Sequence, residues 1–278
     1  MKKYIDLPLK FVIGKNQVTY AYREYGNLKA QPLVLLHHLS ATLDNWDPGF
    51  LDLLAVDNHI IVFDNTGVGK TTGKVPVTIT EMAHDVLYFV DALRLQKFDL
   101  LGLSMGGFIA QEVLLLAPKR VEHLILAGTG PHGGKGIKKV GLLTNYDLLR
   151  ATFMRKDVKE YLFFTRTDNG KKAAKRYFER INTRRENFDD KIKIGAYLHQ
   201  LRAIKRFGKA KPVDFSNFRT PVLVVNGDQD RMVPTVNSYR LHEIFPNSEL
   251  LIYDDAGHMS IFQEQQDFAD KLTKFLRS

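Results

Sequence analysis

Short apolar runs alternate with stretches of helical periodicity along most of the chain, and this alternation constrains the fold more than any other feature. Apolar runs of this kind are typical of strands that helices cover on both faces of a sheet. The runs lie at residues 32–37, 59–64, 99–103, 121–126, 221–225 and 249–253, and shorter ones at 11–13 and 18–22 indicate an opening hairpin. The alternation predicts an α/β fold, with a sheet flanked by helices.

Two of the intervening stretches show the helical pattern clearly. Residues 82–93 place their apolar side chains on one stripe, and we expect Thr80 to cap the N-terminus of that helix. Residues 268–276 repeat apolar positions at helical spacing, which predicts a helix near the C-terminus.

Basic residues are concentrated in one segment. Residues 131–215 hold 22 Lys and Arg against 9 Asp and Glu, a net charge of +13, whereas the rest of the chain holds 18 against 22, a net of −4. This shift predicts a basic helical insert, 131–215, within a core domain made of residues 1–130 and 216–278. A basic surface can bind nucleic acid, anionic lipid or an acidic substrate. We favour a solvated set of helices, and do not expect nucleic acid as a partner, because no recognition motif accompanies the charge.

The composition excludes several kinds of site. The chain has no cysteine, which excludes disulfides, Cys-ligated zinc, iron–sulfur clusters and a thiol nucleophile. No apolar run approaches the ~20 residues that span a bilayer. Asp6, Pro8 and Lys10 interrupt the start of the chain, so we expect no secretory signal and, by default, a cytoplasmic protein. The sequence does not indicate an oligomeric state.

The pentapeptide Gly102-Leu103-Ser104-Met105-Gly106 has the pattern G-x-S-x-G. It directly follows an apolar run and precedes a helical stretch, residues 108–117. On such a sharp strand-to-helix turn, the residues two positions either side of the serine must be small, and glycines meet this need. The turn pushes the hydroxyl out above the sheet, where the helix N-terminus favours developing negative charge. We therefore predict that Ser104 is a nucleophile.

A serine nucleophile needs a base that takes its proton, and the base needs an acid that orients it. His258 follows the last apolar run and Asp230 follows the run before it, so we expect both beside Ser104 at the carboxyl edge of the sheet. Asp228 is a rival acid. We prefer Asp230 because a residue further beyond the strand can lean over to a histidine, whereas Asp228 suits a role in fixing the turn.

Acyl transfer also needs two backbone N–H groups that point at one oxygen. We expect one from Met105, the residue after the nucleophile, and the other from Leu39, in the loop after residues 32–37.

Taken together, these segments resemble the α/β-hydrolase superfamily, in particular its esterases and cofactor-free haloperoxidase-like members. The resemblance covers nearly the whole chain and is carried by the loop 37–46, the turn 64–69, the pentapeptide 102–106, the Asp230 loop and the pair Gly257-His258. It implies an eight-stranded, mostly parallel sheet with a helical cap between strands six and seven, where residues 131–215 fall. The resemblance also implies that the amide of Leu39 is the second hydrogen-bond donor of the oxyanion hole.

Two positions depart from the pattern of that superfamily. His38 stands where glycine is usual, and Thr66 stands where arginine is frequent. His38 could line the substrate pocket or donate a hydrogen bond to the substrate, but we favour a packed histidine.

Two other sequence features give weaker evidence of function. Residues 67–72 resemble the end of a phosphate-binding loop, but Asp64 stands where the pattern needs its first glycine, and Gly73 and Pro76 break the helix that should follow. The histidines form no His-x-x-x-His pair backed by a carboxylate. We expect no metal and no cofactor.

The leading hypothesis is a serine hydrolase that cleaves a small or medium carboxylic ester, with thioester, lactone and amide substrates also open. A carbon–carbon bond hydrolase and a cofactor-free perhydrolase with haloperoxidase-like activity are the alternative enzymes, and a small-molecule receptor is the non-enzymatic alternative. Trp46, Phe108 and Met259 are expected to line the substrate pocket together with His38, as judged from their neighbours along the chain.

Overall fold

The computed structural model describes residues 2–184 and 186–277. Its centre is one eight-stranded sheet with the strand order β1-β2-β4-β3-β5-β6-β7-β8. The strands are β1 (Lys10–Ile13), β2 (Thr19–Gly26), β3 (Pro32–Leu36), β4 (His59–Phe63), β5 (Phe98–Leu103), β6 (Val121–Ala127), β7 (Val222–Gly227) and β8 (Ser248–Tyr253). Each predicted run is a strand, so the α/β prediction is confirmed.

The sheet is mostly parallel. β2 pairs antiparallel with β1 and β4, whereas every pair from β4 through β3, β5, β6 and β7 to β8 is parallel. Leu36 at the end of β3 is level with Gly102 of β5, and Ala127 at the end of β6 is level with Val225 of β7. The loops that follow the parallel strands therefore meet at one edge of the sheet.

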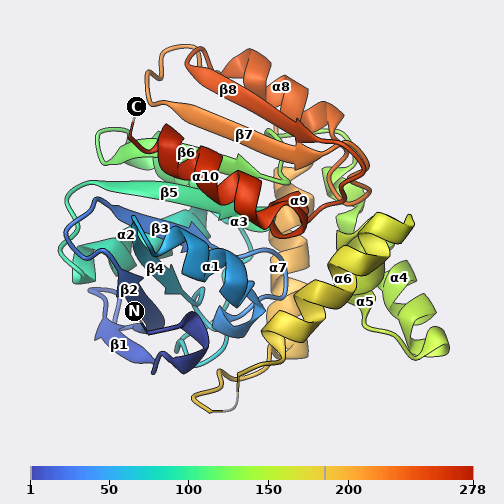
Figure 1. Ribbon diagram of the computed structural model, residues 1–278. Coiled ribbons are helices and arrows are strands. Elements are labelled where there is room, and N and C mark those ends of the chain that lie inside the picture. The colour runs from blue at the N-terminus through green and yellow to red at the C-terminus, as the bar shows by residue number, and fades with distance from the viewer. Residues whose placement is uncertain (1, 185, 278) are drawn as a thin grey trace.

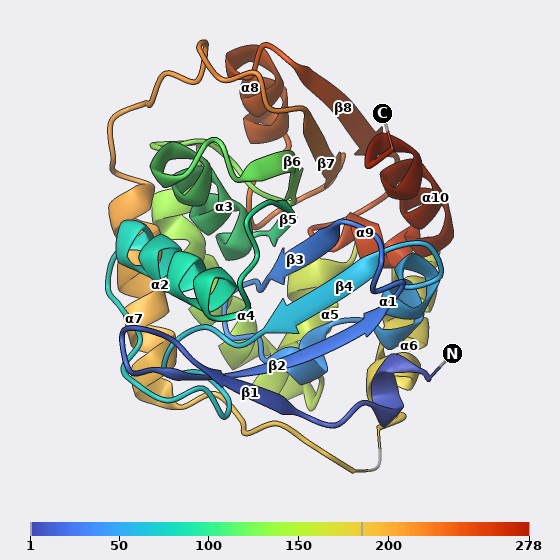
Figure 2. The ribbon, with the colours of Figure 1, turned by 90° about the vertical axis from the view of Figure 1, so that its left-hand side faces the viewer.

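Helices cover both faces of this sheet. Figure 2 shows α2 (Ile79–Ala92) and α3 (Met105–Leu116) on one side, with α1 (Pro48–Leu54) and α10 (Gln265–Phe275) on the other. The remaining helices of the core are α8 (Val236–Ile244) and α9 (Ser260–Gln263), with short 3-10 turns at Tyr4–Asp6 and Leu43–Asn45. No helix in residues 2–184 and 186–277 is long and apolar enough to cross a membrane.

The predicted cap of α2 was wrong by two residues. Thr78 has extended backbone and its Oγ1 accepts a hydrogen bond from the amide of Glu81 at 3.2 Å, which is the contact of an N-cap. Thr80 lies inside the first turn, and its hydroxyl donates to Glu112 at 2.9 Å instead.

Among the described residues, four α-helices separate β6 from β7: α4 (Val140–Met154), α5 (Val158–Phe163), α6 (Asp168–Ile181) and α7 (Ile194–Phe207), preceded by a 3-10 turn at Ile137–Lys139. In Figure 1, α4, α5 and α6 lie on the side to which β7 and β8 point. These helices occupy the segment for which the sequence predicts a basic insert, whose domain boundaries stay a prediction. We call residues 131–215 the insert.

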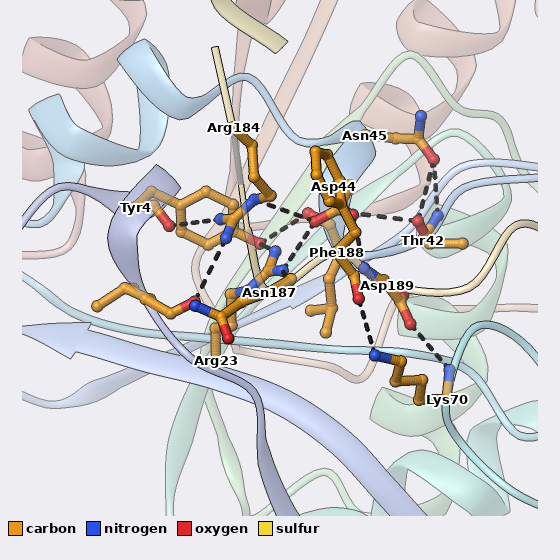
Figure 3. A network of polar contacts seen from close by, with 12 residues as sticks. Tyr4, Arg23, Thr42, Asp44, Asn45, Lys70, Arg184, Asn187, Phe188 and Asp189 are labelled. Atoms are coloured by element: carbon orange, nitrogen blue, oxygen red, sulfur yellow. Dashed lines mark hydrogen bonds and ion pairs between the residues drawn. The ribbon is translucent and has the colours of Figure 1, made fainter. Parts of the chain in front are cut away.

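A buried polar network ties the insert to the core (Figure 3). Arg23 of β2 is fully buried and pairs with Asp44 at 2.8 Å, and Arg184 of the insert reaches the same carboxylate oxygen at 3.3 Å. The other oxygen of Asp44 accepts the amide of Asp189 at 2.8 Å, and Arg184 also donates to the carbonyl of Tyr4 at 2.6 Å. One carboxylate therefore joins β2 to the chain that links α6 and α7.

Candidate active site

Ser104 lies on the turn between β5 and α3. Its φ of 56° and ψ of −114° form a conformation that residues with a side chain rarely adopt. The surrounding structure holds this strain, because the amide of Ser104 donates to Ala127 at 2.8 Å and its carbonyl accepts the hydroxyl of Thr129 at 2.9 Å. The strained turn lifts the side chain of Ser104 above the end of β5.

The glycines on either side of Ser104 have no room for a side chain. A Cβ at Gly106 would collide with the carbonyl of Leu36 in β3, and a Cβ at Gly102 would collide with the carbonyl of Gly106. A Cβ at Gly107 would lie 2.5 Å from the side chain of Thr129. The sharp turn therefore requires glycine at these positions, as its sequence pattern indicates.

His258 and Asp230 come together with Ser104 at the same edge of the sheet. Nε2 of His258 lies 2.8 Å from Oγ of Ser104, and Nδ1 lies 2.7 Å from Oδ2 of Asp230. All three residues are buried. Because a carboxylate only accepts, Nδ1–H donates to Asp230 and leaves the Nε2 lone pair facing the serine hydroxyl.

The second oxygen of Asp230 is fixed by the loop after β7. It accepts the amides of Met232 at 2.8 Å and Val233 at 2.9 Å. Asp228 is exposed and accepts the amide of Ala256 at 3.2 Å, so it braces the loop that leads to His258. Of the two acids that the sequence offers, the structure places Asp230 against the imidazole.

The loop after β3 lies across from Ser104. Met105 is the first residue of α3, so its amide has no acceptor within the helix, and Leu39 lines the cavity beside Ser104. The neighbouring amide of Ser40 donates to Oε1 of Gln200 at 2.9 Å, which holds this loop from α7. The role of the Leu39 and Met105 amides in an oxyanion hole stays a prediction.

His38 lines the cavity as a neutral acceptor. Its Nδ1 lies 2.8 Å from the carbonyl of Leu39, and a carbonyl only accepts, so Nδ1 carries the proton. Burial lowers the pKa of His38 to about 3. Its Nε2 has no hydrogen-bond partner among the described residues. Its ring packs edge-on against that of Phe163, with the two ring centroids 5.0 Å apart. With Nδ1 engaged by the carbonyl of Leu39 and Nε2 unprotonated and buried, His38 does not offer a donor to the cavity, and its ring is packed as the favoured interpretation has it.

A cavity of about 260 Å³ opens beside Ser104 and His258. Residues of the insert make most of its wall, and the apolar or aromatic ones among them are Leu148, Val158, Leu162, Phe163, Ile192, Ile194 and Tyr197. Lys159 and Lys193 also line it. A space of this size with a mostly apolar wall suits a small or medium apolar group.

Trp46, Phe108 and Met259 were wrongly expected in this pocket. All three are buried in the core, outside the lining of the cavity in the described part of the chain. The indole N–H of Trp46 donates to Nδ1 of His37 at 2.8 Å. The ring of Phe108 stacks on the ring of Phe207, with their centroids 4.5 Å apart. The insert residues that do form the wall were missed, because nothing local in their sequence says which apolar side chains face the cavity.

Comparison with known proteins agrees with this architecture. Residues 31–265 match the family described as alpha/beta hydrolase fold. A solved structure of an alpha/beta hydrolase fold protein from Chitinophaga pinensis has 32% sequence identity and a TM-score of 0.93, with 100% of each chain covered.

Two curated relatives are more distant. A protein from Rhizobium rhizogenes, provisionally named a carbamate hydrolase, is 29% identical over 259 residues, which covers 90% of this chain and 94% of the relative. The 2-hydroxy-6-oxo-6-(2'-aminophenyl)hexa-2,4-dienoic acid hydrolase of Metapseudomonas resinovorans is 26% identical, with 95% and 89% covered.

Proposed function

Because the chain belongs to the alpha/beta hydrolase fold family, we propose that it is a serine hydrolase that cleaves a small or medium carboxylic ester. The family makes it an enzyme that acts as a hydrolase; the triad, the bond and the substrate are our proposal. The observation that carries it is the continuous hydrogen-bonded chain from Ser104 through His258 to Asp230, at 2.8 and 2.7 Å.

In this proposal, Oγ of Ser104 attacks the ester carbonyl while Nε2 of His258 takes the hydroxyl proton. Asp230 holds the imidazolium in place through Nδ1–H. The amides of Leu39 and Met105 would donate to the oxygen that becomes negative in the tetrahedral intermediate. His258 then gives its proton to the leaving alkoxide, which departs as the alcohol. Water, deprotonated by the same histidine, releases the acid and restores Ser104.

The cavity supports an ester with an apolar acyl group. Its wall is apolar near Leu162 and Phe163, which favours an apolar substituent on the acyl group. A carbamate or a carbon–carbon bond next to a carbonyl presents the same electrophile to Ser104. Cleavage of a carbamate and cleavage of a carbon–carbon bond are therefore the second candidate activities, since the two curated relatives are named for a carbamate and a dienoic acid.

A fluorophosphonate probe tests the nucleophile, and a panel of p-nitrophenyl esters of rising chain length tests the substrate class. We expect the wild type to be labelled and to hydrolyse the shorter esters, and Ser104→Ala to do neither. Ser216→Ala, which changes an exposed serine far along the chain, is the control and should behave as the wild type.

Labelling without ester turnover would redirect the search to carbamates, to carbon–carbon bonds, to perhydrolysis, or to a receptor that keeps the triad. Absence of labelling would contradict the assignment of Ser104. The cytoplasmic location expected from the sequence stays a prediction.

A further inference from the structure

Helix α4 has its large apolar side chains on the outside. Leu142, Tyr146, Leu149 and Phe153 follow one another at spacings of four, three and four residues, so they form one stripe. Their exposed fractions run from 64% to 87%. The opposite face, which is buried, carries Val140, Thr144, Asp147 and Ala151. A surface helix usually has the reverse arrangement.

Two polar contacts of α4 fix this orientation. Asp147, whose side chain is fully buried, pairs with Arg231 of the core at 3.3 Å. Asn145, which is exposed, accepts a hydrogen bond from the hydroxyl of Tyr197 of α7 at 2.7 Å. Rotation of α4 to bury the stripe would break both contacts and leave a buried carboxylate without its partner.

The exposed stripe continues to the mouth of the cavity. Leu148 of α4 is 46% exposed and Ile194 of α7 is 80% exposed, and both also line the cavity beside Ser104. We call this surface the apolar rim: Leu142, Tyr146, Leu148, Leu149, Phe153 and Met154 of α4, with Ile194 and Leu198 of α7. A contiguous apolar surface of this kind marks a site of contact with another apolar phase or molecule.

Basic residues flank the apolar rim along the chain. Lys138 and Lys139 directly precede α4, Arg155 directly follows it, and Lys193 adjoins Ile194; all four are exposed. They belong to the insert, whose net charge is +13. If a second copy of the chain packed on this rim by two-fold symmetry, the basic residues of the two copies would face each other and repel. An anionic lipid surface instead offers both an apolar interior and a complementary headgroup charge.

We propose that the apolar rim inserts into the surface of an anionic membrane and that the enzyme takes apolar esters from it through the adjoining cavity mouth. The membrane contact is inferred only from the apolar rim and the basic residues that flank it. The delivery of substrate rests on the proposed function.

Vesicle flotation of the Ser104→Ala protein tests the membrane contact without turnover. We expect binding to vesicles of equal parts phosphatidylglycerol and phosphatidylcholine, and weaker binding in high salt and to phosphatidylcholine alone. Leu149→Ser with Phe153→Ser should lower the affinity by about tenfold or more, because two apolar groups leave the lipid.

The matched control is Leu28→Ser with Val56→Ser, which removes two apolar side chains that are each 62% exposed but lie outside the insert. It should bind like the parent. Equal binding by the Leu149/Phe153 variant, or no binding of the parent to anionic vesicles, would overturn the proposal. A dimer in sedimentation equilibrium that this variant dissociates, without vesicle binding, would also overturn it in favour of a second copy.

Turnover tests the delivery of substrate. In the otherwise wild-type protein, Leu149→Ser with Phe153→Ser should leave hydrolysis of a short soluble p-nitrophenyl ester unchanged and slow that of a long-chain ester held in anionic vesicles. Equal rates on the vesicle-held ester would overturn the delivery. Loss of all ester turnover in the wild type would contradict the proposed function, while the flotation result would still report on the membrane contact.

Discussion

Nη1 of Arg231 lies 3.3 Å from Oδ2 of Asp147, so the residue that follows the proposed triad acid is paired with the buried face of α4. The same guanidinium donates to the carbonyl of Tyr161 in α5 at 3.1 Å. The loop that carries Asp230 therefore also holds two helices of the insert, so one loop positions both the proposed triad acid and helices that wall the cavity.

Asp147→Asn should lower the free energy of unfolding by about 1–3 kcal/mol, because it leaves Arg231 without its anionic partner and a neutral amide in a buried site. Urea unfolding measures the change. Asp168→Asn is the control, since Asp168 pairs with Lys171 at an exposed position, where an ion pair contributes less than about 1 kcal/mol. Equal losses in the two variants would contradict a structural role for the Asp147 pair.

Asp230→Asn should lower kcat on the best ester by about a thousandfold or more, because an amide can donate to Nδ1 and favour the wrong imidazole tautomer. Asp228→Asn, two residues away, should change kcat by less than about tenfold, as its carboxylate only braces a loop. Steady-state kinetics of both variants decides between the two acids. A larger loss in Asp228→Asn would show that the base takes its orientation from that residue.

Gln200→Leu should lower kcat by about tenfold while KM changes little, because the half-buried amide of Ser40 loses its acceptor and the adjacent Leu39 peptide loses its fixed position. The measurement is kcat and KM on one ester at constant pH. Gln266→Leu, at an exposed position of α10, is the control and should leave both constants as they are. An unchanged kcat in Gln200→Leu would mean that the loop after β3 keeps its geometry without α7.

Acid should destabilise the fold through His38. Its pKa is about 3 in the folded protein and about 6.5 in the unfolded chain, so between these values the unfolded chain binds the proton and the folded protein does not. Stability is therefore lost as the pH falls from about 6.5 towards 3, by about 1.4 kcal/mol per pH unit for this one group.

Replacement of the His38 imidazole tests whether this residue contributes to the loss of stability in acid. His38→Gln should reduce the slope of unfolding free energy against pH in this window, as measured by urea unfolding at a series of pH values. His84→Gln, which changes an exposed histidine, should leave the slope unchanged. The same slope in His38→Gln and the wild type would show that the imidazole takes up its proton in the folded state.

The strands, and the meeting of Ser104, Asp230 and His258 at one edge of the sheet, could be predicted because their signals are local. Each buried strand is a short apolar run, and the functional residues directly follow such runs, as Ser104 follows β5. Parallel pairing then brings the carboxyl ends to one edge without further information. The cap of α2 was misplaced because Thr78 and Thr80 have the same local pattern, and only the backbone conformation distinguishes them.

The pocket could not be predicted, because proximity in sequence to a catalytic residue does not say where a side chain points. Trp46 faces His37 rather than the cavity, and Phe108 faces Phe207. The true wall comes from the insert, for example Leu162 and Tyr197, through contacts that join distant parts of the chain. Likewise, no sequence pattern of His38 shows that its Nδ1 carries the proton and donates it in a hydrogen bond to the carbonyl of Leu39.

The wide separation of the triad along the chain has a consequence during synthesis. Ser104 and His258, whose side chains meet at 2.8 Å, stand 154 positions apart, and the histidine follows the last strand, β8. A ribosome therefore completes the proposed nucleophile and its turn long before it makes the proposed base. A nascent or shortened chain that ends before β8 carries Ser104 without His258, so in the proposed mechanism reactivity arises only after the last strand and the loop that follows it are made.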